Sequence, residues 1–149
     1  MHDVGSMKRA VVGLGVLALA ASLGGCGQKR VSECNALILV INGGVQGLEK
    51  APKAENDPTG VSDLKAMAER MDKVAGDTAS VPVTITEVKR FSSEYQKMAK
   101  DIAKAARDLA AAAESRDAAK RAAAEQSLDA AVKQEDPLVD SINKFCQTQ

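Results

Sequence analysis

Aromatic side chains are almost missing from this 149-residue sequence, which contains no tryptophan, one tyrosine and two phenylalanines. The three that exist, Phe91, Tyr95 and Phe145, fall on apolar stripes and are expected to fill a core. No aromatic residue is left over to form a flat platform against which a sugar could stack. Saccharide recognition of that kind is therefore not expected.

Histidine is nearly absent as well, since His2 is the only one. Histidine is the commonest general base and metal ligand, and Ser-His and Cys-His nucleophiles both require it. The adjacent carboxylates Glu135 and Asp136 do not replace it, because neighbours on a helix point about 100° apart. With no phosphate-binding loop and no metal-ligand spacing either, we predict a protein that is not an enzyme and that carries no cofactor or metal.

The sequence also lacks an excess of charge, because 20 basic residues balance 20 acidic ones. The two signs alternate along the chain and do not form blocks. A chain of this kind has no long-range field that would attract nucleic acid. We expect no nucleic-acid partner.

The N-terminal region combines a basic pair, Lys8 and Arg9, an apolar stretch over residues 10–23, and the run Leu23-Gly24-Gly25-Cys26. This order is typical of a secretory signal, and it resembles the signal peptide and lipobox of bacterial lipoproteins. The resemblance implies removal of residues 1–25, a diacylglycerol on the thiol of Cys26, and residues 26–30 as a lipidated tether. It also implies attachment to a membrane through the lipid.

The residue after the lipidated cysteine is Gly27, where lipoproteins retained at the inner membrane of many Gram-negative bacteria commonly have Asp. The resemblance therefore implies the outer membrane of the cell envelope. Two alternatives are an uncleaved membrane anchor and an ordinary secretory signal cut near residues 20–22. The apolar stretch is shorter than the ~20 residues that span a bilayer, which weighs against the first.

Two cysteines, Cys34 and Cys146, remain once Cys26 is assigned to the lipid, and they can pair in only one way. An exported protein meets an oxidising environment, so we predict a disulfide between them. It would contribute ~4 to 5 kcal/mol in the chain-entropy description. No C-x-x-C motif is present, so its expected role is structural; two buried thiols are the alternative.

From residue 31 onward, apolar residues recur at alternating steps of three and four, as in core-facing helices. Breakers at 50–60 and 76–82 and a change of register near 114–117 divide the pattern into four helices, at about 31–49, 61–75, 84–114 and 117–146. Gly76 is expected to end the second, Ser115 or Asp117 to cap the fourth, and Pro137 to kink it. One continuous helix over 84–136 is the competing interpretation.

Four helices with short connections predict an all-α fold, an up-down-up-down four-helix bundle over residues 31–149 with the last two helices longer. In this topology Cys34 and Cys146 meet at one end of the bundle. The lipid on Cys26 would bring that end to the membrane. The turn between the last two helices would then lie far from it.

We expect an envelope protein that binds or scaffolds a protein partner through its helical surface. The candidate partner surface is the far turn, with five polar residues: Ser115, Arg116, Asp117, Lys120 and Arg121. The alternative is a small-molecule pocket inside the bundle, near the glycines of the first helix and three methionines. Those residues are Gly43, Gly44, Gly47, Met67, Met71 and Met98.

Overall fold

A computed structural model describes residues 25–49, 57 and 59–147. All regular secondary structure in these residues is helical, which confirms the predicted all-α class. The helices are α1 (Gly25–Glu49), α2 (Val61–Ala79), α3 (Thr86–Ser115), α4 (Ala118–Val132) and α5 (Glu135–Gln147).

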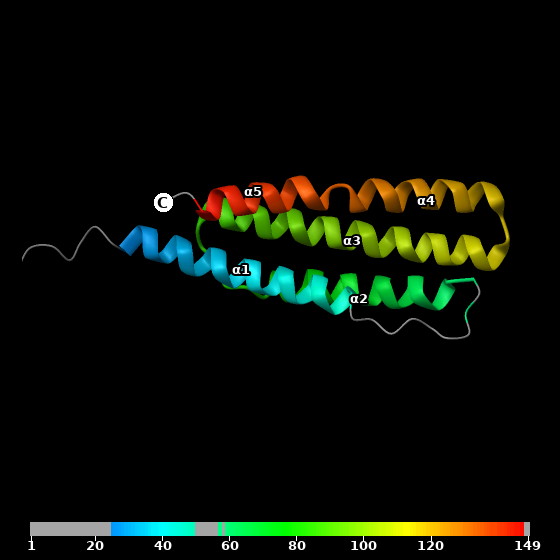
Figure 1. Cartoon of the computed structure of the whole chain (residues 1–149), viewed down its shortest axis with the longest axis horizontal. Coiled ribbons are helices and arrows are strands. Elements are labelled where there is room, and N and C mark those ends of the chain that lie inside the picture. Colours follow the sequence, from blue (N-terminus) through cyan, green and yellow to red (C-terminus); the bar gives the residue numbers. More distant parts are fainter. Residues whose placement is uncertain (1–24, 50–56, 58, 148–149) are drawn as a thin grey trace, which may run out of the picture.

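The helices lie side by side in an elongated array (Figure 1). The closest packing is between α2 and α3, and α4 lies along α3. The first helix, α1, lies mainly against α2 and also contacts α3 and α5. Its N-terminal turns extend beyond the end of the array formed by α3 and α5 (Figure 1).

The core is built around the stripe of α3 that the sequence predicts. Phe91, Tyr95, Met98 and Ile102 are all buried. A row of buried alanines beside them, Ala99, Ala103, Ala106 and Ala110, lets the neighbouring helices approach closely. Large and small side chains thus share the surface of α3, as a tightly packed helix interface requires.

The buried face of α1 differs in part from the predicted one. Alternating steps of three and four from residue 31 predict that Val31, Cys34 and Ile41 face the core. Cys34 and Ile41 are buried as predicted, but Leu37 is also fully buried and Val31 is 44% exposed. Val31 lies in the second turn of α1, and the first turns of α1 extend past the end of α3 and α5 (Figure 1). Leu37 is buried because α1 contacts α2, α3 and α5, a wider contact than a single stripe of alternating steps covers.

Gly76 does not end α2, which continues to Ala79. The glycine has ordinary helical geometry, and Ser80 closes the helix by donating its backbone N–H to the carbonyls of Gly76 and Asp77 at 3.1 Å each. The extra turn places Thr78 in the core, fully buried. An extended connection that contains Pro82 follows before α3, and it overlaps the break predicted at 76–82.

The predicted turn between the last two long segments is confirmed, and the continuous helix over 84–136 is wrong. Helix α3 ends at Ser115, and Arg116 adopts a left-handed conformation with φ 55°. Asp117 then caps α4, because its Oδ1 accepts hydrogen bonds from the N–H groups of Ala119 (3.1 Å) and Lys120 (3.0 Å). A side-chain cap of this kind satisfies amides that would otherwise have no partner.

Pro137 breaks the fourth segment where a kink was expected. Helix α4 stops at Val132, residues 133–134 form a turn, and α5 starts at Glu135. In a continuous helix the carbonyl of Lys133 would accept the N–H of residue 137, which proline lacks, and the proline ring would clash with that carbonyl. Pro137 instead occupies the first turn of α5, where no N–H is needed.

The predicted tether over 26–30 has helical backbone, because α1 begins at Gly25. Among the residues that the structure describes, none of the helices is both long and apolar enough to cross a bilayer. The signal segment over residues 1–24 lies outside the described residues.

Candidate functional site

A disulfide joins Cys34 in α1 to Cys146 in α5, with the two Cα atoms 5.7 Å apart. The pair spans 112 positions of the sequence and ties the first helix to the last. This is the pairing that the sequence predicts. Cys34 is buried, as expected of a structural bond.

A buried carboxylate lies one residue before this disulfide. Glu33 accepts hydrogen bonds from the hydroxyl of Thr84 (2.6 Å) and from the N–H groups of Thr84 (2.8 Å) and Ile85 (2.9 Å). These bonds, the hydroxyl first, hold the pKa of the Glu33 carboxyl below its usual range. Since Ile85 is the N-cap of α3, Glu33 supplies from α1 the cap that α3 does not provide for itself.

Aromatic contacts complete the attachment of α1 at this end. The ring of Phe145 meets that of Phe91 edge-on, with centroids 5.7 Å apart. The guanidinium of Arg30 lies 5.6 Å from the centroid of Phe145, within range of a cation–π interaction. Disulfide, cap and aromatic contacts thus hold the N-terminal part of α1 to both α3 and α5.

The predicted partner surface, Ser115 to Arg121, lies at the turn between α3 and α4. Four of its five side chains make local contacts there. Ser115 Oγ donates to the carbonyl of Ala112 at 3.0 Å, and Asp117 caps α4. Lys120 lies 3.5 Å from Asp117, and Arg121 is 2.9 Å from Glu125. Arg116 is exposed.

The residues of the predicted small-molecule pocket do not come together. Met67 and Met71 line an internal cavity of about 100 Å³, well below the roughly 300 Å³ of small-ligand pockets. Met98 is buried in the core. The glycines Gly43 and Gly47 are exposed and do not line this cavity.

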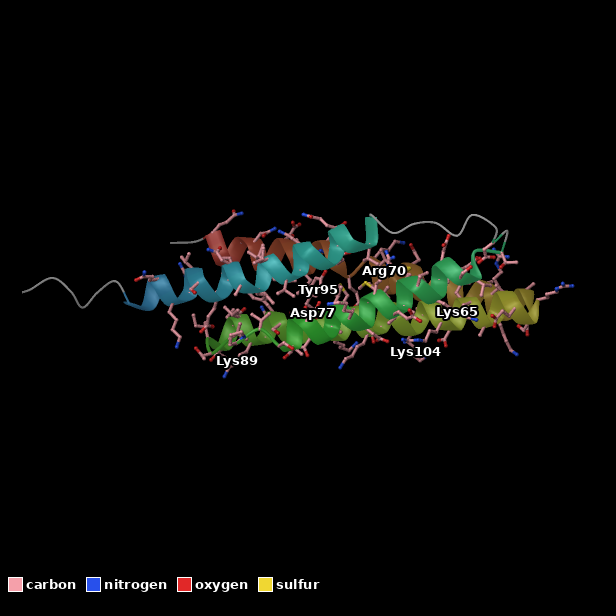
Figure 2. All side chains as sticks on the ribbon, turned by 90° about the horizontal axis from the view of Figure 1, so that it is seen from below. Lys65, Arg70, Asp77, Lys89, Tyr95 and Lys104 are labelled. Atoms are coloured by element: carbon pink, nitrogen blue, oxygen red, sulfur yellow. A yellow bond between two sulfur atoms is a disulfide. The ribbon has the colours of Figure 1, made fainter. Side chains whose placement is uncertain are left out.

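The same cavity borders the buried hydroxyl of Tyr95, which donates a hydrogen bond to Glu135 Oε1 at 3.1 Å. Burial, and then the nearby carboxylate, raise the pKa of Tyr95 well above its usual value. A tyrosine in that state stays protonated and does not act as a base. Figure 2 shows it between the helices, whereas Lys65 and Lys104 lie on the outside.

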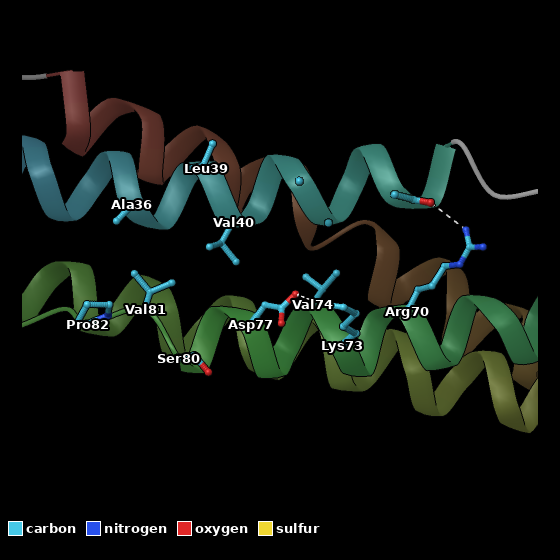
Figure 3. A pocket seen from close by; sticks show the side chains of 13 residues that line it. Ala36, Leu39, Val40, Arg70, Lys73, Val74, Asp77, Ser80, Val81 and Pro82 are labelled. Carbon is cyan, nitrogen blue, oxygen red and sulfur yellow. Dashed lines mark hydrogen bonds and ion pairs between the residues drawn. The ribbon is translucent and has the colours of Figure 1, made fainter.

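A groove of about 750 Å³ runs between α1 and α2 (Figure 3). We name it the α1–α2 groove and define it by six of the residues that line it: Ala36, Leu39, Gly43 and Gly47 on α1, and Lys73 and Asp77 on α2. Leu39 is 75% exposed, and Lys73 pairs with Asp77 at 2.5 Å.

The three glycines of α1 play different parts beside this groove. At Gly44, a Cβ atom would lie 2.5 Å from Cγ2 of Val74, so the absence of a side chain allows α1 to approach α2. At Gly43 and Gly47, an added Cβ would meet nothing within 4 Å. Gly44 therefore has a packing role, whereas Gly43 and Gly47 leave open space.

Sequence reasoning missed two of these features. The signal for Glu33 was available, because it is the one charged residue between Val31 and Leu48, and a lone charge in an apolar stretch requires a partner. The α1–α2 groove had no such signal, since it depends on how the two helices approach each other. The described residues contain no cluster of His, Cys, Asp or Glu suited to a metal ion.

Comparison with known proteins gives no relative: no family model, no curated protein and no solved structure matches the chain.

Proposed function

We propose that this chain is a bacterial lipoprotein of the cell envelope, anchored to the outer membrane by a lipid on Cys26. Its helical domain serves as a binding or scaffolding module without enzymatic activity. The observation that carries the proposal is the signal pattern ending in Leu23-Gly24-Gly25-Cys26, which resembles a lipobox. The expected protein partner belongs to the envelope, and nucleic acid is not expected to bind.

The proposed architecture of the module is an up-down-up-down four-helix bundle in which α4 and α5 together form the fourth helix. The contacts of α2 with α3, of α3 with α4, and of α1 with α2 and α5 support it. So does the disulfide, since the start of the first helix and the end of the last meet in that topology.

The anchor and the attachment of α1 are close in sequence, which bears on how the module is held. Cys26 lies eight positions before Cys34, and α1 is helical from Gly25 onward. Eight helical residues extend ~12 Å, so the disulfide-linked end would lie close to the lipid headgroups. The turn at Arg116 would be the part farthest from the membrane and open to a partner.

Intact mass spectrometry of the protein isolated from bacterial membranes tests the anchor. The expected mass is that of residues 26–149 plus acyl chains, and two thiols become available to alkylation only after reduction. A Cys26→Ser variant is the matched control, because it removes the thiol that receives the lipid and little else. It should lose the added mass of the acyl chains.

Either of two results would refute the proposal. One is an unmodified Cys26 in the membrane fraction, which would indicate an uncleaved anchor. The other is a mature N-terminus near residue 21, which would indicate an ordinary secretory signal.

A further inference from the structure

The outer surface of α1 over residues 31–48 carries less charge than the other long helices that the structure describes. Between Val31 and Leu48 the only charged residue is Glu33, and its carboxylate is turned inward to cap α3. The other long helices carry rows of exposed ion pairs, such as Lys97 with Asp101 and Lys104 with Asp108 on α3. A neutral, partly apolar helix surface is typical of one that another protein covers.

This neutral surface borders the α1–α2 groove, which is lined by one projecting apolar side chain and several small residues. Leu39 is the most exposed large hydrophobic residue described. Gly43 and Gly47 follow it at steps of four, so all three lie on one face of α1. The space above both glycines is empty, so a leucine from another helix could lie there.

The relative position of α1 and α2 is fixed by two contacts. Gly44 lies against Val74, and Arg70 Nη1 donates to the carbonyl of Gly47 at 2.9 Å. The residue numbers thus run in opposite directions along the two helices, and Gly43 lies level with residues 74 and 75. The midpoint between Lys73 and Asp77 falls at this same level.

We propose that a second copy of this chain docks on the α1–α2 groove through a two-fold axis that passes in front of α1 at the level of Gly43. A two-fold axis lying parallel to this face and perpendicular to the helices stacks α1 on α1 and α2 on α2, in antiparallel directions. Leu39 then faces Gly47 of the other copy, and Gly43 faces Gly43. Such self-complementarity is what an isologous interface requires.

The charges of α2 fit the same axis. Lys73 and Asp77 are equally distant from it, so Lys73 of each copy faces Asp77 of the other. These side chains pair within one copy at 2.5 Å and are both exposed. In the dimer they would form a four-membered network of alternating sign, which favours the antiparallel arrangement. The apolar fit and the charge pattern therefore indicate the same position for the two-fold axis.

The size of the face indicates weak association. From Ala36 to Gly47 the groove extends ~17 Å along α1, and it is two helices wide. Such a contact falls at the lower end of the size range of specific interfaces. Disulfide trapping of the dimer is therefore a better measurement than the molar mass of the protein at equilibrium.

The test is a Gly43→Cys variant of the full chain, expressed in bacterial membranes and treated with a mild oxidant. The two introduced thiols would lie across the two-fold axis, so a disulfide-linked dimer is expected on a non-reducing gel. Gly76→Cys is the matched control, because Gly76 is also an exposed helical glycine with open space around it but lies outside the groove. It should give at least roughly tenfold less dimer, since no interface brings its thiols together.

Charge exchange tests the axis in the Gly43→Cys background. Asp77→Lys alone and Lys73→Asp alone each place like charges opposite one another, and each should reduce trapping about fivefold to tenfold. Mixing the two variants in one membrane restores opposite charges only between unlike copies, so mixed dimers should recover. Loss of the internal Lys73–Asp77 pair cannot explain that recovery, because both variants lack it.

Several results would overturn the proposal. One is trapping of Gly43→Cys no greater than that of Gly76→Cys. Another is no recovery in the mixture. A third is a native mass spectrum in which the wild-type protein is monomeric and carries a bound lipid that Gly47→Leu removes, because the occupant would then be an acyl chain. Cross-linking of residue 43 only to a different protein would also refute it.

Discussion

The contact between Gly44 and Val74 provides a sensitive test of how α1 packs on α2. In a Gly44→Ala variant, the new Cβ would lie 2.5 Å from Cγ2 and 3.1 Å from Cγ1 of Val74. Ordinary carbon contacts are ~3.5 to 4 Å, so the helices must separate or the valine must move. Val74 is buried, and its β-branched side chain has one preferred rotamer in a helix. It therefore cannot easily turn away.

The change in the free energy of unfolding depends on two opposing terms. Replacing glycine by alanine within a helix favours folding by about 1 kcal/mol, whereas overpacking in a filled interface costs about 1 to 3 kcal/mol. Gly43→Ala has the same first term without the second, since its Cβ meets nothing within 4 Å. The difference in unfolding free energy between the two variants should therefore be about 1 to 3 kcal/mol, with Gly44→Ala the less stable.

Urea unfolding followed by circular dichroism measures this difference, with the Cys34–Cys146 disulfide intact in all samples. Gly76→Ala serves as a second control on another helix, because its Cβ also meets nothing. Adding Val74→Ala to Gly44→Ala should recover part of the loss, because the clash disappears. If Gly44→Ala proves as stable as Gly43→Ala, the close approach of α1 and α2 at this point is refuted.

Substitutions at three further residues test other parts of the structure. Thr78→Val should raise the unfolding free energy by about 1 kcal/mol, since Thr78 Oγ1 is buried with no hydrogen-bond partner among the described residues; no gain in urea unfolding would show that the hydroxyl is satisfied. Asp117→Ala should lower the unfolding free energy by about 1 kcal/mol, because α4 loses its cap. Asp117→Asn keeps a capping side chain and should not lower it. Equal losses of stability in the two variants would argue against capping. The pKa of the Glu33 carboxyl is lowered in the folded state. The contribution of Glu33 to stability should therefore be present above about pH 4.3 and disappear as the pH falls through the pKa of the folded state. Thermal unfolding of Glu33→Gln should lack this part of the acid sensitivity, and pH profiles identical to those of the wild type would contradict the role of Glu33 as the cap of α3.

The elements that were predictable are those set by local chemistry. The stripe of α3 follows from its spacing, and the turn at Arg116 follows from a change of register with Asp117 as a cap. The disulfide follows from counting cysteines. In each case the information lies within a few residues or in composition.

The features that were missed depend on contacts between helices. Gly76 is a typical helix end, yet α2 continues to Ala79 and is closed by the backbone N–H of Ser80. Leu37 is buried because α1 has neighbours on more than one side. The groove lies where Gly44 allows α1 to approach Val74, and no pattern within α1 distinguishes Gly44 from Gly43.

The disulfide also determines how the chain would carry mechanical tension. A pull applied between the residues before Cys34 and those after Cys146 passes through the sulfur–sulfur bond, since the two Cα atoms are 5.7 Å apart. The 112-position segment between them lies outside that path and experiences no stretching. Helices α2, α3 and α4 would therefore stay folded under loads that would unravel the same helices in a reduced chain.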